Sequence, residues 1–282
     1  MADTADSLES SGWSGPAWAR PRVLNALTVL TLVVLVVLQF LWWREHGRPI
    51  SWLLLPATPL LAFLPSGVLV KAFRKRWTAQ WAEAHGFFYQ RSADWPVPQW
   101  DFPPFTIGRA RRFRVRDAMR GPLGRYPASF FHLTWLHNNW INVSTHYRNI
   151  FVLELPGTLP RLTMGPNLDT TAGDRVLFES SDFNEQFSVY CANPAFAHAV
   201  CTPRTIERLV ELGRRSPAAK LTKLEIVGNL LVGVTTLGNR PPEIGEIFDL
   251  MRIVAEGIPR FVWLDHATPG SAVSTVLERN MA

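Results

Sequence analysis

Seven arginines lie within seventeen residues, from 109 to 125, and only one acidic residue accompanies them. In the stretch RRFRVRDAMRG, Arg112, Arg114 and Arg116 alternate with a phenylalanine and a valine. Successive side chains of a β-strand point to opposite faces, so this pattern predicts a strand with the three arginines on one face. Near a membrane such a face would bind anionic lipid headgroups. The alternative is a solvated face whose arginines pair with carboxylates elsewhere in the fold.

The set of residues that comes nearest to a metal-binding pattern is Cys191, His198 and Cys201. A structural zinc site usually has four ligands at characteristic short spacings, and a fourth ligand here would have to be chosen among scattered histidines. Two unpaired cysteines on an apolar helix face more often act as small core residues. We therefore predict no metal site, and the low cysteine content is compatible with a reducing compartment.

Other polar clusters have structural interpretations that compete with catalytic ones. Glu179, Asp182 and Glu185 lie within seven residues, and we interpret them as loop and helix-capping residues. The HNNW stretch at 137–140 is interpreted as a turn between strands. The chain contains no phosphate-binding glycine loop, no GxSxG motif and no HExxH motif, so no catalytic residue and no cofactor is assigned.

The composition indicates an apolar segment beyond an ordinary core. Apolar residues make up 47% of the 282 residues and charged residues only 18%, against about 25% in a typical soluble domain. Of the net charge of +6, residues 1–76 carry +4. A nucleic-acid-binding protein would concentrate its positive charge on the folded part, so we predict no nucleic-acid partner.

Two uncharged runs near the N-terminus predict a transmembrane hairpin with spans at 23–43 and 50–70. Twenty-one residues of helix measure roughly 30 Å, the thickness of the hydrocarbon core of a bilayer. The second run contains three prolines and a glycine, so the alternative for it is a re-entrant segment.

The cations that flank these runs predict the orientation of the hairpin. Two cations precede the first run, four follow the second, and the loop between the runs holds only two. The positive-inside rule then places both termini in the cytoplasm and the chain in the plasma membrane. The block that ends the hairpin consists of Lys71, Arg74, Lys75 and Arg76.

The remainder of the chain predicts an α+β domain at 108–265, built on an antiparallel sheet with two or three packed helices. Strands are expected in 111–121, 129–137, 146–156, 175–180 and 186–190, and helices in 194–202, 204–213 and 241–257. Thr202 is the predicted N-cap of the second of these helices, with Pro203 at its first position. Residues 220–236 predict a hairpin with Gly228-Asn229 at its turn, and 260–265 a short strand or a tail. Residues 71–107 predict a juxtamembrane helix and a proline-rich linker, and 1–22 and 266–282 predict tails, the first of them disordered.

Several stretches resemble a family of uncharacterised actinobacterial membrane proteins. The resemblance rests on VLELPGTLPRLTMGP (152–166), FESSDFNEQFSV (178–189) and NPAFAHAVCTPRTIERL (193–209), together with the paired apolar runs. Asn193 departs from the family, in which an aspartate is expected at this position. The resemblance implies two N-terminal spans followed by a cytoplasmic α+β domain, and it implies no activity.

The function that these patterns favour is a membrane-anchored cytoplasmic module that binds a protein or lipid partner without catalysis. The expected partners are the lipid bilayer itself, anionic headgroups or another membrane protein. The alternative is a membrane-bound enzyme acting on a lipid or envelope precursor. Histidines and carboxylates converging in a buried pocket would favour the enzyme, and a filled core with a surface patch would favour the binding module.

Overall fold

The computed structural model describes residues 29–30, 33–34, 37–42, 44–45, 77–92, 105, 110–138, 143–166, 172–237 and 241–266. The chain divides into two compact units, Met1–Ala79 and Gln80–Ala282. In the first unit, the described residues from 29 to 45 are helical. No helix among the described residues combines the length and the apolarity needed to cross a membrane. The second predicted span, most of the first, and the cations from Lys71 to Arg76 lie outside the described residues.

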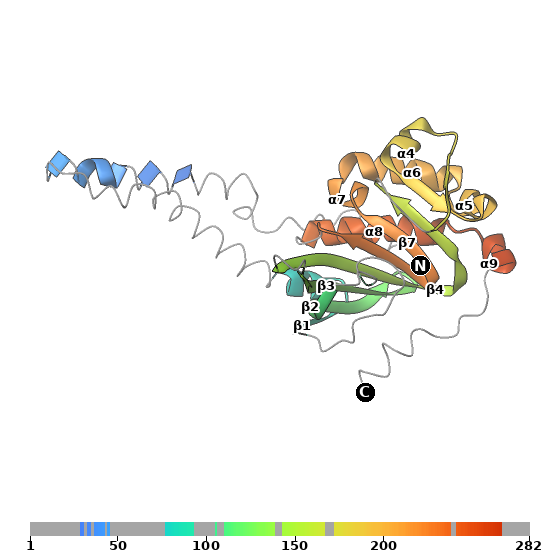
Figure 1. Ribbon diagram of the computed structural model, residues 1–282, viewed down its shortest axis with the longest axis horizontal. Helices are drawn as coiled ribbons and strands as arrows, with labels where there is room; N and C mark the ends of the chain where they lie inside the picture. The colour runs from blue at the N-terminus through green and yellow to red at the C-terminus, as the bar shows by residue number, and fades with distance from the viewer. Residues whose placement is uncertain are drawn as a thin grey trace. The chain divides into compact units, whose positions relative to one another are not determined.

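The second unit is built on one antiparallel sheet, which confirms the predicted α+β class (Figure 1). The sheet has the order β1-β2-β3-β4-β6-β5, and β7 pairs with β4. The strands are β1 (Phe88–Ser92), β2 (Ala110–Leu123), β3 (Tyr126–Asn138), β4 (Val143–Gly165), β5 (Asp174–Val176), β6 (Ser188–Cys191) and β7 (Lys223–Thr235). Because β1 pairs with β2, the sheet includes residues from the segment ahead of residue 108.

Strand β4 runs through 23 residues and joins the two halves of the sheet. Its first half pairs with β3 and its last residues pair with β6, while β7 follows it through both halves. The register with β7 shifts between Glu154 and Leu159, where β4 contains Pro156, and again between Leu159 and Leu162, where it contains Pro160. Proline lacks the N–H that a regular ladder needs and is therefore found at such irregular positions.

The prediction of a hairpin in 220–236 is wrong, because Lys223–Thr235 forms the single strand β7. Gly228 has a positive φ of 61° and pairs with Leu159 at the irregular part of the β4–β7 ladder. A glycine with positive φ is typical of both a hairpin turn and a β-bulge. The Gly-Asn pair therefore marks a bulge inside one strand, and the sequence signal alone does not separate the two.

Residues 77–84 are helical and run into the start of this unit, and six further helices lie among its described residues. They are α4 (Ser181–Gln186), α5 (Pro194–Val200), α6 (Pro203–Arg215), α7 (Pro217–Lys220), α8 (Pro241–Gly257) and α9 (Arg260–His266). The predicted cap at Thr202 is confirmed, since its hydroxyl accepts from the N–H of Thr205 at 3.3 Å. The prediction of a strand or tail at 260–265 is wrong, because these residues form α9.

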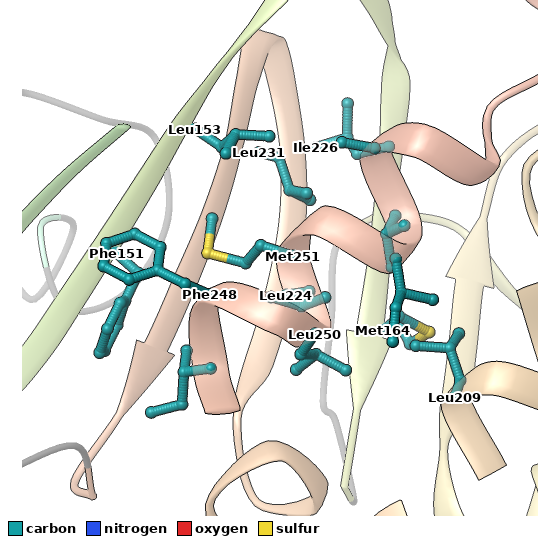
Figure 2. Packing of buried hydrophobic residues seen from close by; sticks show 14 of the residues in the cluster. Phe151, Leu153, Met164, Leu209, Leu224, Ile226, Leu231, Phe248, Leu250 and Met251 are labelled. Atoms are coloured by element: carbon teal, nitrogen blue, oxygen red, sulfur yellow. The ribbon is translucent and has the colours of Figure 1, made fainter. Parts of the chain in front are cut away.

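The main core lies between the sheet and α8, and α6 packs against α8 and contributes Leu209, which lies near Met164 of β4, to the same core (Figure 2). Apolar residues at helical spacing place one face of α8 against β4 and β7. Phe248 of α8 meets Phe151 of β4 edge to face at 5.2 Å between ring centroids, and Met251 lies beside them (Figure 2). The sheet thus has one helix-bearing face over much of its length.

A second, smaller cluster lies on the opposite face of the sheet. Phe131 and Ile150 belong to it, whereas the adjacent residues Phe130 and Phe151 belong to the main core. Because neighbouring residues of a strand face opposite sides, these assignments fix which face each side chain of β3 and β4 occupies. The same parity places the polar side chains described next.

Candidate functional site

The pairing of β2 with β3 is irregular at two positions, one on each side of the segment that holds Arg114 and Arg116. The register between β2 and β3 shifts between Arg111 and Arg114 and again between Arg116 and Met119. Arg112 and Asp117, which lie in these two shifts, have positive φ values of 55° and 48°. Non-glycine residues rarely adopt this conformation, so the ladder is interrupted on both sides of the three-residue segment from Arg114 to Arg116.

Arg114 and Arg116 lie on the helix-bearing face, in two rows that cross three strands. In one row Arg114 pairs with Thr134 of β3, which pairs with Tyr147 of β4. In the other row Arg116 pairs with His132, which pairs with Asn149. Val115, between the two arginines, belongs to the cluster on the opposite face. We call the exposed or half-buried members of these rows, together with Arg112 in the adjoining register shift, the arginine face; they are Arg112, Arg114, Arg116, His132, Thr134 and Tyr147. The shift puts Arg111 in register with Leu136, so the alternation predicted through Arg112 is interrupted and strand pairing places only Arg114 and Arg116 on this face.

The floor of the arginine face is a fixed polar network. The Nδ1 atom of His132 lies 2.7 Å from Oδ1 of Asn149, and Nδ2 of Asn149 donates to the carbonyl of Leu237 at 2.5 Å. Asn149 is fully buried, and the rings of His132 and Tyr147 stack at 5.7 Å. Tyr147 remains 45% exposed. An aromatic ring and a hydrogen-bonded imidazole therefore stand beside two guanidinium groups.

The arginines of this segment divide into paired and unpaired groups. Arg120 contacts Glu154 at 3.5 Å, and Arg125 donates to the hydroxyl of Tyr126 at 2.7 Å. Arg112, Arg114 and Arg116 are exposed, and within the described part of the chain none of them forms an ion pair with a carboxylate.

The cysteine and histidine set does not come together as a ligand cluster. Both cysteines are buried and free, and the His198 ring packs edge-on against Phe178 at 4.8 Å. Burial raises the pKa of the Cys201 thiol to about 12, and burial also raises the pKa of Cys191. Among the residues that the structure describes, no group of three His, Cys, Asp or Glu side chains is placed to hold a metal ion.

The acidic cluster at 179–185 belongs to the structure of α4. Asp182 forms an ion pair with Arg214, while Glu179 and Glu185 are exposed. The side chain of Asn184 bonds both backbone groups of Phe178, at 2.6 Å and 3.1 Å, and so closes the loop ahead of the helix. This arrangement agrees with the interpretation as loop and capping residues. Of the HNNW stretch, residues 139–140 lie outside the described residues.

A second region, for which the sequence gives no local signal, is a groove of about 520 Å³ at the C-terminal end of α8. Its walls come from the β2–β3 turn, from the irregular part of β4 and from the connection between α8 and α9. It contains one carboxylate, Glu154, and no histidine. Three segments that are far apart in the sequence form it, so spacing within any one of them gives no signal.

Comparison with known proteins provides little further information. No family model matches the chain, and no curated protein sequence matches it. One solved structure with a similar course of the chain is that of the mycobacterial trehalose monomycolate transport factor A, TtfA, with 13% sequence identity and a TM-score of 0.40. The match covers 64% of this chain and 96% of that one. At this identity and score the similarity supports no conclusion about family or function.

Proposed function

We propose that this chain is a membrane-anchored cytoplasmic module whose arginine face binds the anionic headgroups of the membrane surface. The observation that carries the proposal is the exposure of Arg112, Arg114 and Arg116 without carboxylate partners among the described residues. Guanidinium groups form paired hydrogen bonds with phosphate oxygens, and each cation close to an anionic membrane contributes about 1 kcal/mol.

The neighbouring side chains suit the same surface. Tyr147 offers an exposed ring with a polar tip, a type of side chain that prefers the membrane interface. His132 and Thr134 add polar groups to the same rows. The β-sheet holds all of these positions on a rigid framework, which lowers the entropic cost of binding.

The anchor that we propose is the hairpin of two spans at 23–43 and 50–70, with both termini in the cytoplasm. Its support is the sequence: two uncharged runs of 21 residues and the block from Lys71 to Arg76. In the described residues of the first run, apolar side chains are strongly exposed, including Val29 at 59% and Leu30 at 61%. The predicted linker at 71–107 is in part a piece of the folded domain, because β1 pairs with β2, so we propose the residues between 70 and 80 as the connection and 1–22 and 267–282 as tails.

The orientation of the anchor is tested by reporter fusions to the full chain. A fluorescent protein that matures only in the cytoplasm, fused after Ala282, is expected to fluoresce, and an enzyme reporter that is active only outside the cytoplasm is expected to be silent there. The reverse pattern would refute the orientation.

Headgroup binding is tested with the second unit alone, from Gln80 to Ala282, in a vesicle flotation assay. We expect this fragment to float with vesicles that contain phosphatidylglycerol and not with vesicles of phosphatidylcholine alone. Because screening lowers the interaction beyond about 8 Å at physiological salt, flotation is expected to fall as salt rises. Equal flotation with neutral vesicles would contradict the proposal, and no flotation with either would favour a protein partner.

A further inference from the structure

The groove at the C-terminal end of α8 combines apolar walls with two cations. Leu155 and Ile258 are buried at its base, Trp263 is half-buried at its side, and Pro127 and Pro156 complete the apolar part. Its volume of about 520 Å³ lies within the range of sites that hold small ligands, about 300–1,000 Å³. Helix α9, which carries Trp263, packs beside β4 (Figure 1).

The charge of the groove is positive. Arg125 and Arg260 are both exposed, and within the described residues neither forms an ion pair with a carboxylate. The only acid in the lining, Glu154, is contacted by Arg120 at 3.5 Å. Arg125 also lies over the ring of Tyr126 at 4.9 Å and donates to its hydroxyl, which holds the guanidinium in place.

One structural role for these arginines is to stabilise the C-terminal end of α8. The hydroxyl of Tyr126 donates to the carbonyl of Ala255 at 3.1 Å, so Arg125 acts on this helix end through Tyr126. This role accounts for one cation. It does not explain the second cation, Arg260, or the open groove with apolar walls. Helix α9, which begins at Arg260, also exposes Phe261 at 51% and Leu264 at 74%.

We propose that the groove binds one molecule of a single-chain amphiphile with an anionic head. The two guanidinium groups would hold the head, because an arginine fork matches a carboxylate or a phosphate, and the acyl chain would lie against Leu155, Ile258 and Trp263. The two guanidinium groups would recognise fatty-acid carboxylates and monoalkyl phosphates in the same way. A neutral amphiphile would give neither cation an anionic partner.

This site is separate from the arginine face. Tyr126, at the groove, is six residues along β3 from His132, which pairs with Arg116, and six residues of strand measure about 20 Å. Variants of one region therefore leave the other region unchanged. The groove can bind an amphiphile whether or not the arginine face binds a membrane.

The test uses the full chain in nanodiscs of phosphatidylcholine and three photoactivatable probes with the same diazirine-bearing chain: hexadecanoate, hexadecyl phosphate and hexadecanol. After irradiation, the labelled peptides are mapped by mass spectrometry. We expect at least one anionic probe to label residues 125–127, 154–156 or 258–264, about tenfold more than hexadecanol does. Labelling by one anionic probe alone identifies the head that the groove prefers.

Substitutions at the two cations complete the test. The pair Arg125→Gln and Arg260→Gln is expected to lower groove labelling about tenfold, and lysine at both positions is expected to restore most of it. The control pair Arg204→Gln and Arg208→Gln, two exposed arginines of α6 with the same loss of charge, is expected to leave groove labelling unchanged. The proposal is overturned if hexadecanol labels the groove as strongly as the anionic probes do, or if no probe labels these residues. It is also overturned if the double glutamine variant melts at the same temperature as the unaltered chain and is labelled to the same extent.

Discussion

The side chain of Asn149 links His132 on the neighbouring strand to the carbonyl of Leu237, two residues after the end of β7. Since Nδ2 of Asn149 donates to that carbonyl, its Oδ1 faces His132, and Nδ1 of the imidazole carries the hydrogen. One buried amide therefore fixes both the ring in the floor of the arginine face and the path of the chain toward the long helix.

Replacing Asn149 by alanine is expected to destabilise the folded domain. The change removes two hydrogen bonds in a fully buried position and leaves the Leu237 carbonyl without this donor, at a cost of about 1–3 kcal/mol. Urea unfolding followed by circular dichroism measures it. The control is Tyr147→Phe, which changes only the hydroxyl of a 45% exposed side chain and is expected to shift the free energy of unfolding by less than about 0.5 kcal/mol. An equal loss in both variants would contradict the role of the amide.

Gly228 is expected to tolerate asparagine better than alanine. A Cβ at this position would meet no atom within 4 Å, so the cost of Gly228→Ala comes from the positive φ of 61° alone and is about 1–2 kcal/mol. Asparagine adopts this backbone conformation more readily than alanine, so Gly228→Asn is expected to cost less. The same urea titration ranks the two variants, and alanine as stable as asparagine would show that the bulge relaxes.

The buried thiol of Cys201 predicts a loss of stability at alkaline pH. Its pKa is raised from 9.0 to about 12 by burial, so between these values the unfolded chain releases a proton that the folded chain keeps. The contribution of this thiol to the free energy of unfolding is therefore fully present below pH 9, and it is lost as the pH rises from 9 toward 12. At pH 10.5 the loss amounts to about 2 kcal/mol.

A Cys201→Ala variant isolates this contribution from the other groups that titrate at high pH. Its free energy of unfolding is expected to fall about 2 kcal/mol less than that of the unaltered fragment between pH 8 and pH 10.5. The alanine lowers stability at both pH values through lost packing, so the comparison uses the change with pH and not the absolute value. Parallel pH profiles for the two proteins would contradict a raised pKa.

Part of this fold can be predicted from local patterns in the amino-acid sequence. The alternation around Arg114 and Val115 predicts a strand with these two side chains on opposite faces, and the Thr202-Pro203 pair predicts the start of α6. Both signals depend only on residues next to each other in the chain. The structure has the strand and the helix where these signals predict them.

The rest depends on pairing between distant segments. The row of Arg114, Thr134 and Tyr147 exists only because of the register of three strands, which no single segment specifies. The Gly228-Asn229 signal is equally compatible with a turn and with a bulge, and its pairing with Leu159 decides between them. The groove between Tyr126, Leu155 and Trp263 likewise forms only once the helices have packed on the sheet.

The central claim is that the arginine face, and not the overall positive charge, holds the domain on anionic membrane. The measurement that tests it compares two triple variants of the fragment from Gln80 to Ala282 in flotation with phosphatidylglycerol vesicles. One variant carries glutamine at Arg112, Arg114 and Arg116. The other carries glutamine at three exposed arginines of α6, which are Arg204, Arg208 and Arg215.

Both variants lose three positive charges, so a difference between them reports on position alone. Three cations at about 1 kcal/mol each predict a loss of apparent affinity of roughly 100-fold for the strand variant, and a much smaller loss for the α6 variant. Matching melting curves show that both remain folded. Equal loss in the two variants, or unchanged flotation of the strand variant, would contradict the account.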